Sequence, residues 1–172
     1  MKVYLAGKIT KNGWRSEIFA GYRSYDPQVQ ESDEVDGFVA TGAFFVGCDH
    51  GCFHGDNSHG VAAYGWRGRD SESYTCEMDL VESPENTVAI CRNAIDRSDV
   101  IFAWIDSVEV YGTLVEIGYA IGKGIPVYLF YSTDNPKSKD MWFAGKIANY
   151  YGYADTIEKA WEMFKLKVRA EL

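Results

Sequence analysis

Glu116 lies in a short segment flanked by glycines, Gly112-Thr113-Leu114-Val115-Glu116-Ile117-Gly118-Tyr119-Ala120, between two apolar runs. This placement predicts a helix that starts after a βα loop, where open α/β sheets bind ligands. Helical spacing predicts a buried face made of Leu114, Ile117, Gly118 and Ile121. Glu116 is therefore expected on the opposite side, free to face a crevice. The helix dipole would keep its carboxylate ionised and able to attack an anomeric carbon, although acidic residues are common in first turns for that electrostatic reason alone.

A second group of reactive side chains lies between Cys48 and His59, a stretch that holds all three histidines of the chain. Its first members alternate in the order Cys48, His50, Cys52, His54. Thiolates and imidazoles bind zinc, but strict alternation would put neighbouring ligands about 6 to 7 Å apart on an extended chain, which suits one ion poorly. Alternatively, this glycine-rich segment closes over a ligand, with His50 or His54 contacting it or moving a proton. A purely structural loop is the third interpretation.

Four apolar runs predict the strands of a sheet that could position these groups. They are Val3–Ala6, 38–46, Val100–Ile105 and Ile125–Tyr131. The first and third are continuous and rich in apolar residues, as buried parallel strands are. Asp99, directly before the third run, is expected to cap the entrance of that strand.

Segments with helical spacing separate these runs. They are predicted at 14–22, from Ser83-Pro84 to about Arg97, from about Thr113 to Gly122, and from an Asp155/Glu158 capping box onward. The alternation of strand and helix predicts an α/β fold: one doubly wound parallel sheet, flavodoxin-like or Rossmann-like, with helices on both faces. Residues 25–83 are irregular and rich in Gly, Asp and Ser, so we expect a long inserted loop region there, which often serves as a lid or binding segment.

The composition fits a single domain that spans residues 1–172. Hydrophobic residues make up 47% and charged residues 24%, so the chain can bury a core. A net charge of −8 argues against long nucleic acid as a partner, and no run of about 18 apolar residues predicts a membrane span. The start MKVYLAGKIT lacks the apolar region of a secretory signal, so we expect a cytoplasmic protein, in which free thiols or a metal site are more natural than disulfides.

Three pieces of the chain together resemble the nucleoside 2-deoxyribosyltransferase family and the related nucleotide N-glycosidases. They are Val3-Tyr4-Leu5-Ala6-Gly7, Ser98-Asp99-Val100-Ile101-Phe102-Ala103 and Gly112–Ala120, in the order that the family has. The resemblance covers 1–10 and 85–131, about a third of the chain. It implies cleavage or transfer at the N-glycosidic bond of a nucleoside or nucleoside 5′-monophosphate, through a glycosyl-enzyme ester and without a cofactor. It also implies a homo-oligomer in which a neighbouring subunit completes the pocket.

The resemblance assigns roles to single residues. Glu116 would be the nucleophile that attacks C1′, with Tyr4 orienting it, although a tyrosine in a strand also suits a hydrophobic core. Gly7 and Gly112 would let the backbone approach sugar or phosphate. Further substrate contacts are expected from Lys8, Asn93, Asp106, Thr113, His50 and His54.

Two departures from the family pattern affect the expected substrate contacts. Several relatives carry an acidic residue where this chain has Cys91, beside Asn93 and Asp96. Their base-reading aspartate is represented only by Asp106 and Glu109, at imperfect register. The rival hypothesis is a non-catalytic nucleotide-binding or sensor module, since one crevice can hold a ligand without breaking it. A metal-dependent hydrolase is a third alternative.

Overall fold

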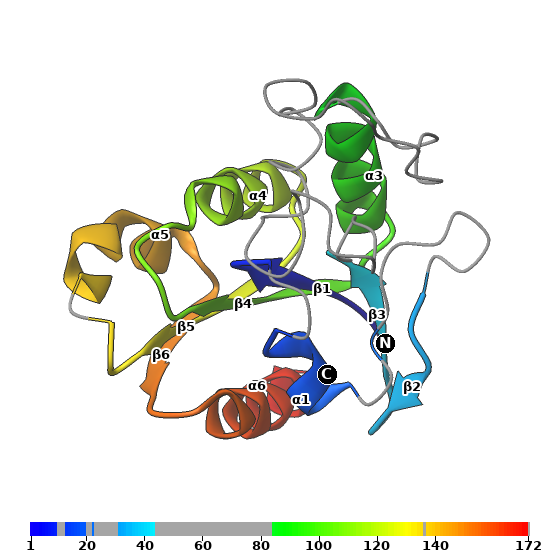
Figure 1. Ribbon diagram of the computed structural model, residues 1–172. Coiled ribbons are helices and arrows are strands. Elements are labelled where there is room, and N and C mark those ends of the chain that lie inside the picture. The colour runs from blue at the N-terminus through cyan, green and yellow to red at the C-terminus, as the bar shows by residue number, and fades with distance from the viewer. Residues whose placement is uncertain (10–12, 20–21, 23–30, 44–83, 136, 172) are drawn as a thin grey trace, which may run out of the picture.

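Among the residues that the structure describes, six strands form one sheet in the order β2-β3-β1-β4-β5-β6 (Figure 1). This computed structural model describes residues 1–9, 13–19, 22, 31–43, 84–135 and 137–171. The strands are β1 (Lys2–Gly7), β2 (Glu34–Val35), β3 (Phe38–Gly42), β4 (Val100–Ile105), β5 (Val127–Ser132) and β6 (Tyr150–Ala154). Neighbouring strands are parallel except β2 and β3. The predicted α/β class with a mostly parallel sheet is therefore confirmed.

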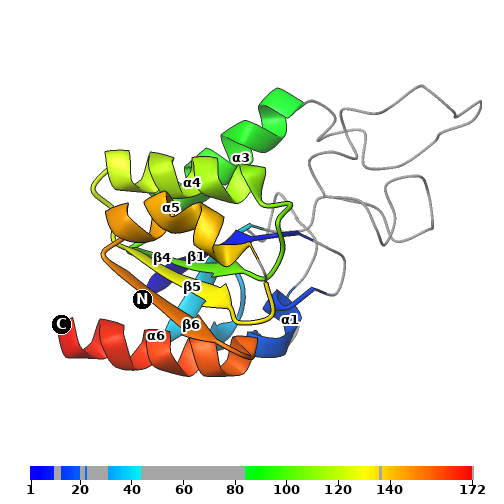
Figure 2. The same cartoon turned by 90° about the vertical axis from the view of Figure 1, so that its left-hand side faces the viewer.

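Helices lie over both faces of the sheet, as Figure 2 shows. One face is covered by α3 (Pro84–Asp96), α4 (Tyr111–Gly122) and α5 (Trp142–Ile147). The 3₁₀ turn η2 (Ser138–Met141) directly precedes α5. The other face is covered by α1 (Arg15–Ile18) and α6 (Ile157–Glu171). Side chains alternate along β1, so Val3 and Leu5 enter the core against α6, whereas Tyr4 and Ala6 enter the core beneath α3 and α4.

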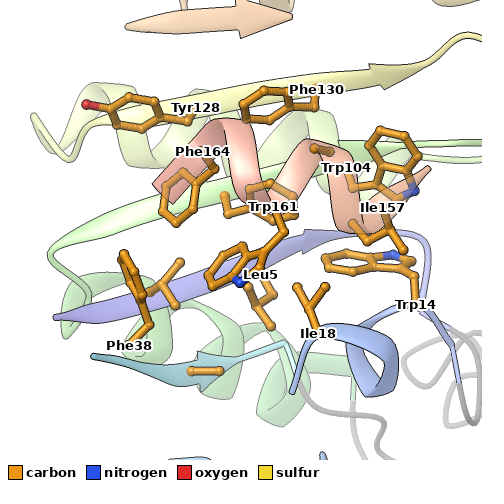
Figure 3. Close-up of a cluster of buried hydrophobic side chains, with 14 of the residues drawn as sticks. Leu5, Trp14, Ile18, Phe38, Trp104, Tyr128, Phe130, Ile157, Trp161 and Phe164 are labelled. Carbon is orange, nitrogen blue, oxygen red and sulfur yellow. The ribbon is translucent and has the colours of Figure 1, made fainter. Parts of the chain in front are cut away.

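The core between the sheet and α6 is aromatic (Figure 3). Trp161 stacks on Phe164 with ring centroids 4.8 Å apart, and it meets Phe38 and Phe102 edge-on at 5.2 Å. The opposite core is lined in part by alanines, Ala6, Ala94, Ala103, Ala120 and Ala144. Small side chains let helices lie close to a sheet, so this second face can bring a polar group of α4 within reach of β1.

The predicted bounds of strands and helices agree best with the structure for the central strands, which are buried on both faces. β1, β4 and α3 have nearly the predicted bounds, but the helix predicted at 14–22 is a single turn, α1. β6 and α5 were not predicted, because β6 is an edge strand that exposes Tyr151 and Tyr153 and so lacks a continuous apolar pattern. The loop region predicted at 25–83 lies outside the described residues, apart from 31–43, which form β2 and β3.

Two predicted caps had different outcomes. The Lys2 backbone N–H donates to Asp99 Oδ2 at 2.7 Å, which confirms Asp99 at the strand entrance. The capping box of Asp155 and Glu158 is wrong, because the Lys159 N–H donates to Thr156 Oγ1 at 3.3 Å, while Asp155 pairs with the Lys159 ammonium at 2.5 Å. Thr156 directly precedes α6 and so takes the capping position. In the described part of the chain, no helix is long and apolar enough to cross a membrane.

Candidate active site

Tyr4 and Glu116 meet above the sheet, although 112 positions separate them in the sequence. Tyr4 lies within β1 and is completely buried, and Glu116 projects from α4, which packs on β1. The Tyr4 hydroxyl donates a hydrogen bond of 2.5 Å to Glu116 Oε1. Hydrogen bonds to an ionised acceptor are short and strong, so this contact fixes the carboxylate relative to the sheet.

The face of α4 that meets the sheet differs from the predicted one. Ile117 is buried as predicted, and Leu114 and Ile121 are partly buried against the same core, but the other fully buried residues are Thr113 and Ala120, and Gly118 is exposed. Glu116 follows Thr113 by three positions and lies on the same side, so the expectation that it points away from the sheet is wrong. The observed buried face is therefore shifted around the helix from the predicted one, because close packing on the sheet favours the smaller side chains of Thr113 and Ala120.

The Glu116 carboxyl group has a pKa raised to about 7. Burial is the main cause, because a surrounding of low polarity disfavours the charged form; the hydrogen bond from Tyr4 and the charge of Arg15 both lower the pKa. The prediction that the helix terminus keeps this group ionised is wrong. α4 begins at Tyr111, so Glu116 lies in the second turn, beyond the reach of the terminal dipole. Near neutral pH the carboxyl group is roughly half ionised and can serve as nucleophile or as acid.

Cys91 and Gly42 complete the surroundings of the Tyr4 side chain. The Cys91 thiol, on α3, interacts with the Tyr4 hydroxyl, and burial raises the pKa of this thiol to about 11. A Cβ atom on Gly42 would lie 3.1 Å from both the Tyr4 ring and the Ala94 side chain, and its φ of 150° also favours glycine. Sequence analysis missed Gly42, because a glycine at the end of an apolar run is equally expected of an ordinary strand terminus.

Lys8 and Asp106 directly follow the two central strands. Gly7 of β1 pairs with Trp104 of β4 in parallel register, so Lys8 and Asp106 leave the sheet at the same edge. Lys8 Nζ lies 2.8 Å from a carboxylate oxygen of Glu109. Burial raises the pKa of Asp106 although much of its side chain is exposed, and the charges of Arg15 and Lys8 act against this rise.

The glycines expected to approach a substrate lie in different surroundings. A Cβ atom on Gly7 would lie 2.7 Å from the Trp104 carbonyl oxygen and 2.8 Å from the Trp14 ring. The missing side chain of Gly7 therefore serves packing within the protein. Gly112 is the second residue of α4, is exposed, and has open space around it.

The other expected contact residues do not form one group. Thr113 is buried in the first turn of α4, one turn before Glu116. Asn93 is exposed on α3, and its backbone carbonyl accepts hydrogen bonds from Arg97. His50 and His54 lie outside the described residues, together with Cys48, Cys52 and His59. The zinc and lid hypotheses for that segment therefore stay predictions.

Arg15 is a buried residue of this site that sequence analysis missed. Its guanidinium donates to backbone carbonyls at the end of β1 and lies 4.3 Å from the centroid of the Trp14 ring. A signal was present, because Arg15 precedes Ile18 by three positions and so shares the buried side of the predicted helix. A charged residue on a buried face needs specific partners.

Within the described ranges, no group of three or more His, Cys, Asp or Glu side chains could hold a metal ion. Comparison of the chain with protein-family models, with curated proteins and with solved structures found no match. The site itself offers a carboxyl group with a pKa near neutrality, bonded to a buried tyrosine of β1 near the middle of a mostly parallel sheet.

Proposed function

We propose that this protein cleaves or transfers at the N-glycosidic bond of a nucleoside or nucleoside 5′-monophosphate, as a relative of the nucleoside 2-deoxyribosyltransferases and nucleotide N-glycosidases. The observation that carries the proposal is the 2.5 Å hydrogen bond from Tyr4 to Glu116. It joins two residues from separate parts of the family resemblance. Both are partners that the proposed chemistry needs, a nucleophilic carboxylate and a group that orients it.

In the proposed reaction the ionised carboxylate of Glu116 attacks C1′. The new bond between a carboxylate oxygen and C1′ forms as the bond from C1′ to the base nitrogen breaks, and the base leaves with the electron pair and takes up a proton from solvent. Water or a second base then attacks C1′ of the ester, loses a proton to solvent and releases the Glu116 carboxylate. Tyr4 occupies Oε1, and Oε2 has no hydrogen bond among the described residues, so Oε2 is the oxygen we assign to the attack. No redox cofactor takes part.

The strand order supports a ligand at this position. Without the short β2, the order β3-β1-β4-β5-β6 supports the doubly wound, flavodoxin-like arrangement that we propose, in which ligands bind at the carboxyl ends of the strands where the order reverses. Here that point lies between β1 and β4, the strands that Lys8 and Asp106 follow. We assign both residues to substrate contacts as part of the proposal.

A second copy of the chain is proposed as the partner. α4 exposes Tyr111 and Val115, at 78% and 72%, and α5 exposes Trp142 and Phe143, each at 62%. Large apolar side chains gathered on two adjacent helices are typical of surfaces that bind another protein. In a cytoplasmic homo-oligomer this surface would lie next to Glu116, and light scattering of the purified protein tests its mass directly.

The proposal is tested by chromatographic detection of free base. Ribonucleosides, deoxyribonucleosides and their 5′-monophosphates are incubated with the wild type, with Glu116→Ala and with Glu116→Gln, in the presence and absence of a second base. Glu162→Gln is the matched control, since Glu162 is exposed on α6 at the opposite face of the sheet. We expect base release by the wild type and the control, and loss of at least a thousandfold in both Glu116 variants, roughly the cost of removing a covalent nucleophile.

Each outcome separates two hypotheses. Release that requires a second base identifies a transferase, and release in water identifies a hydrolase. Release that survives in Glu116→Gln contradicts the assigned nucleophile. Binding of a nucleotide by the wild type without any release identifies the rival function, a nucleotide-binding module.

A further inference from the structure

Arg15 holds the carboxyl end of β1. Its side chain is only 4% exposed and donates hydrogen bonds to three backbone carbonyls at that end of the strand. The Leu5 carbonyl accepts from Nε at 3.0 Å and from Nη2 at 2.6 Å. The Gly7 carbonyl accepts from Nη2 at 3.0 Å, and the Lys8 carbonyl from Nη1 at 2.9 Å. A planar guanidinium can span several acceptors in this way, whereas an ammonium group cannot.

The guanidinium of Arg15 forms no ion pair among the described residues. The Trp14 ring lies against the guanidinium, with 4.3 Å from Cζ to the ring centroid, and keeps water from that side. A buried charge without a counter-ion acts on ionisable groups beyond contact distance, because little solvent screens it.

The charge of Arg15 acts on two acidic groups of the proposed active site, Asp106 and Glu116, of which Glu116 is the proposed nucleophile. Tyr4 from β1 and Cys91 from α3 also face Glu116, and Tyr22, which follows α1, interacts with it more weakly. Burial raises the pKa values of all three groups above their ordinary range, so they are neutral at physiological pH. Arg15 is therefore the charged member of this set, and its charge lowers the pKa of Glu116 alongside the bond from Tyr4.

We infer that Arg15 is a positioning residue for Glu116 with two tasks: it fixes the carboxyl end of β1, the strand whose Tyr4 bonds the Glu116 carboxyl group, and it places a buried positive charge at that strand end. The inference rests on the proposed role of Glu116 and adds the group that prepares this residue for attack. Arg15 touches no reacting atom in the reaction described above. Its effect is exerted through Glu116 and through the backbone of β1.

The first test uses the wild-type protein and needs no change at Arg15. The Arg15 Nε–H resonance is followed by NMR from about pH 5 to about pH 9, across the range in which a group with a pKa near 7 titrates. We expect it to move with a midpoint at the pKa of Glu116, about 7, and to stay constant in Glu116→Gln. Equal movement in the two proteins would overturn the inference, because Glu116 would then not be the group sensed by Arg15.

The second test separates charge from anchoring. Arg15→Gln removes the charge, whereas Arg15→Lys keeps the charge but lacks the planar guanidinium that spans several carbonyls. Arg169→Gln on α6 is the matched control. The carboxyl midpoint of Glu116 should rise by about one pH unit in Arg15→Gln and stay in place in the other two. Amide hydrogen exchange at Gly7 and Lys8 should accelerate at least tenfold in both Arg15 variants, roughly the loss of one hydrogen bond. An unchanged carboxyl midpoint in Arg15→Gln refutes the effect of the charge on Glu116. Unchanged amide exchange in both Arg15 variants refutes the anchoring of β1.

These readouts report protonation and backbone opening and do not depend on base release. A protein that shows the Arg15–Glu116 coupling and releases no base refutes the proposed function and leaves the inference standing. A protein that releases base through Glu116 but shows no coupling refutes the inference alone. If Arg15→Gln does not fold, the wild-type titration still decides the effect of the charge on Glu116, and amide exchange in Arg15→Lys decides the anchoring of β1.

Discussion

Removing the Tyr4 hydroxyl should raise the pKa of Glu116 and move the pH dependence of base release. Tyr4→Phe keeps the buried ring and deletes the donor of the 2.5 Å hydrogen bond to Oε1. This bond lowers the pKa of Glu116 in the wild type, where burial has raised it to about 7. A hydrogen bond to a charged group contributes about 1.5 to 3 kcal/mol, and one pH unit corresponds to 1.36 kcal/mol. The pKa should therefore rise by about 1 to 2 pH units.

The consequence for catalysis follows from the fraction of ionised Glu116. At pH 7 that fraction falls from about one half to between roughly a tenth and a hundredth. We therefore expect kcat/KM at pH 7 to fall about fivefold to fiftyfold and to recover above pH 9, as the acid limb of the profile moves upward. The assay is base release across this range, with a carboxyl NMR titration of Glu116 beside it.

The matched control is Tyr153→Phe, since Tyr153 is exposed on β6 and stacks on Tyr131 at the far edge of the sheet. Its profile should coincide with that of the wild type. A Tyr4→Phe limb at the wild-type position, or one displaced to lower pH, would show that the hydroxyl does not stabilise the ionised carboxylate. The reasoning about the site would then be wrong, whatever the remaining activity.

Other consequences concern stability and reactivity. Because the folded-state pKa of Glu116, about 7, lies above the ordinary 4.5, its stabilising contribution is complete below about pH 4.5 and is lost as the pH rises through 7. Glu116→Gln should therefore be more stable than the wild type at pH 8, by at most roughly 3 kcal/mol, and equally stable at pH 4.5, as thermal unfolding at both pH values would show. Gly42→Ala should cost about 1 to 3 kcal/mol in urea unfolding, because its Cβ meets the Tyr4 ring, whereas Gly118→Ala on the exposed side of α4 should add about 0.5 to 1 kcal/mol. A destabilising Gly118→Ala would contradict the observed face of α4. Cys91 should react with iodoacetamide at least about tenfold more slowly than a peptide thiol at pH 8, measured by mass spectrometry of its peptide, because its pKa is about 11.

The strands and helices that could be predicted are those whose signal is local. β1 and β4 are continuous apolar runs because both faces of a central parallel strand are buried, and α3 begins with a proline that suits a first helical turn. β6 could not be found in this way. Two of its tyrosines face solvent at the sheet edge, and its place is set by pairing with β5, a contact that periodicity does not report.

The site was predicted less completely because its geometry depends on packing between distant segments. Tyr4 and Glu116 were paired through family resemblance, whereas helical spacing alone placed Glu116 on the wrong side of α4. The buried side of α4 also contains small residues that allow close approach to the sheet, and a pattern of large apolar residues displaces the predicted face toward Leu114 and Ile121 and away from Glu116. Gly42 could not be identified from the sequence for a similar reason: its role is to leave space for the Tyr4 ring, a contact that depends on packing.

The ionisation of Glu116 is governed by the first βα unit and not by the helix that carries it. Its position in the second turn of α4 removes most of the dipole's benefit, and burial then favours the neutral acid. The two groups that oppose burial, Tyr4 and Arg15, come from β1 and α1, eleven positions apart in the sequence. Arg15 also bonds the backbone of β1, so any movement of that strand end displaces both groups together. While Glu116 is buried, its ionised share therefore depends on where β1 and α1 place these two groups, which ties its reactivity to the folded arrangement of that edge of the sheet.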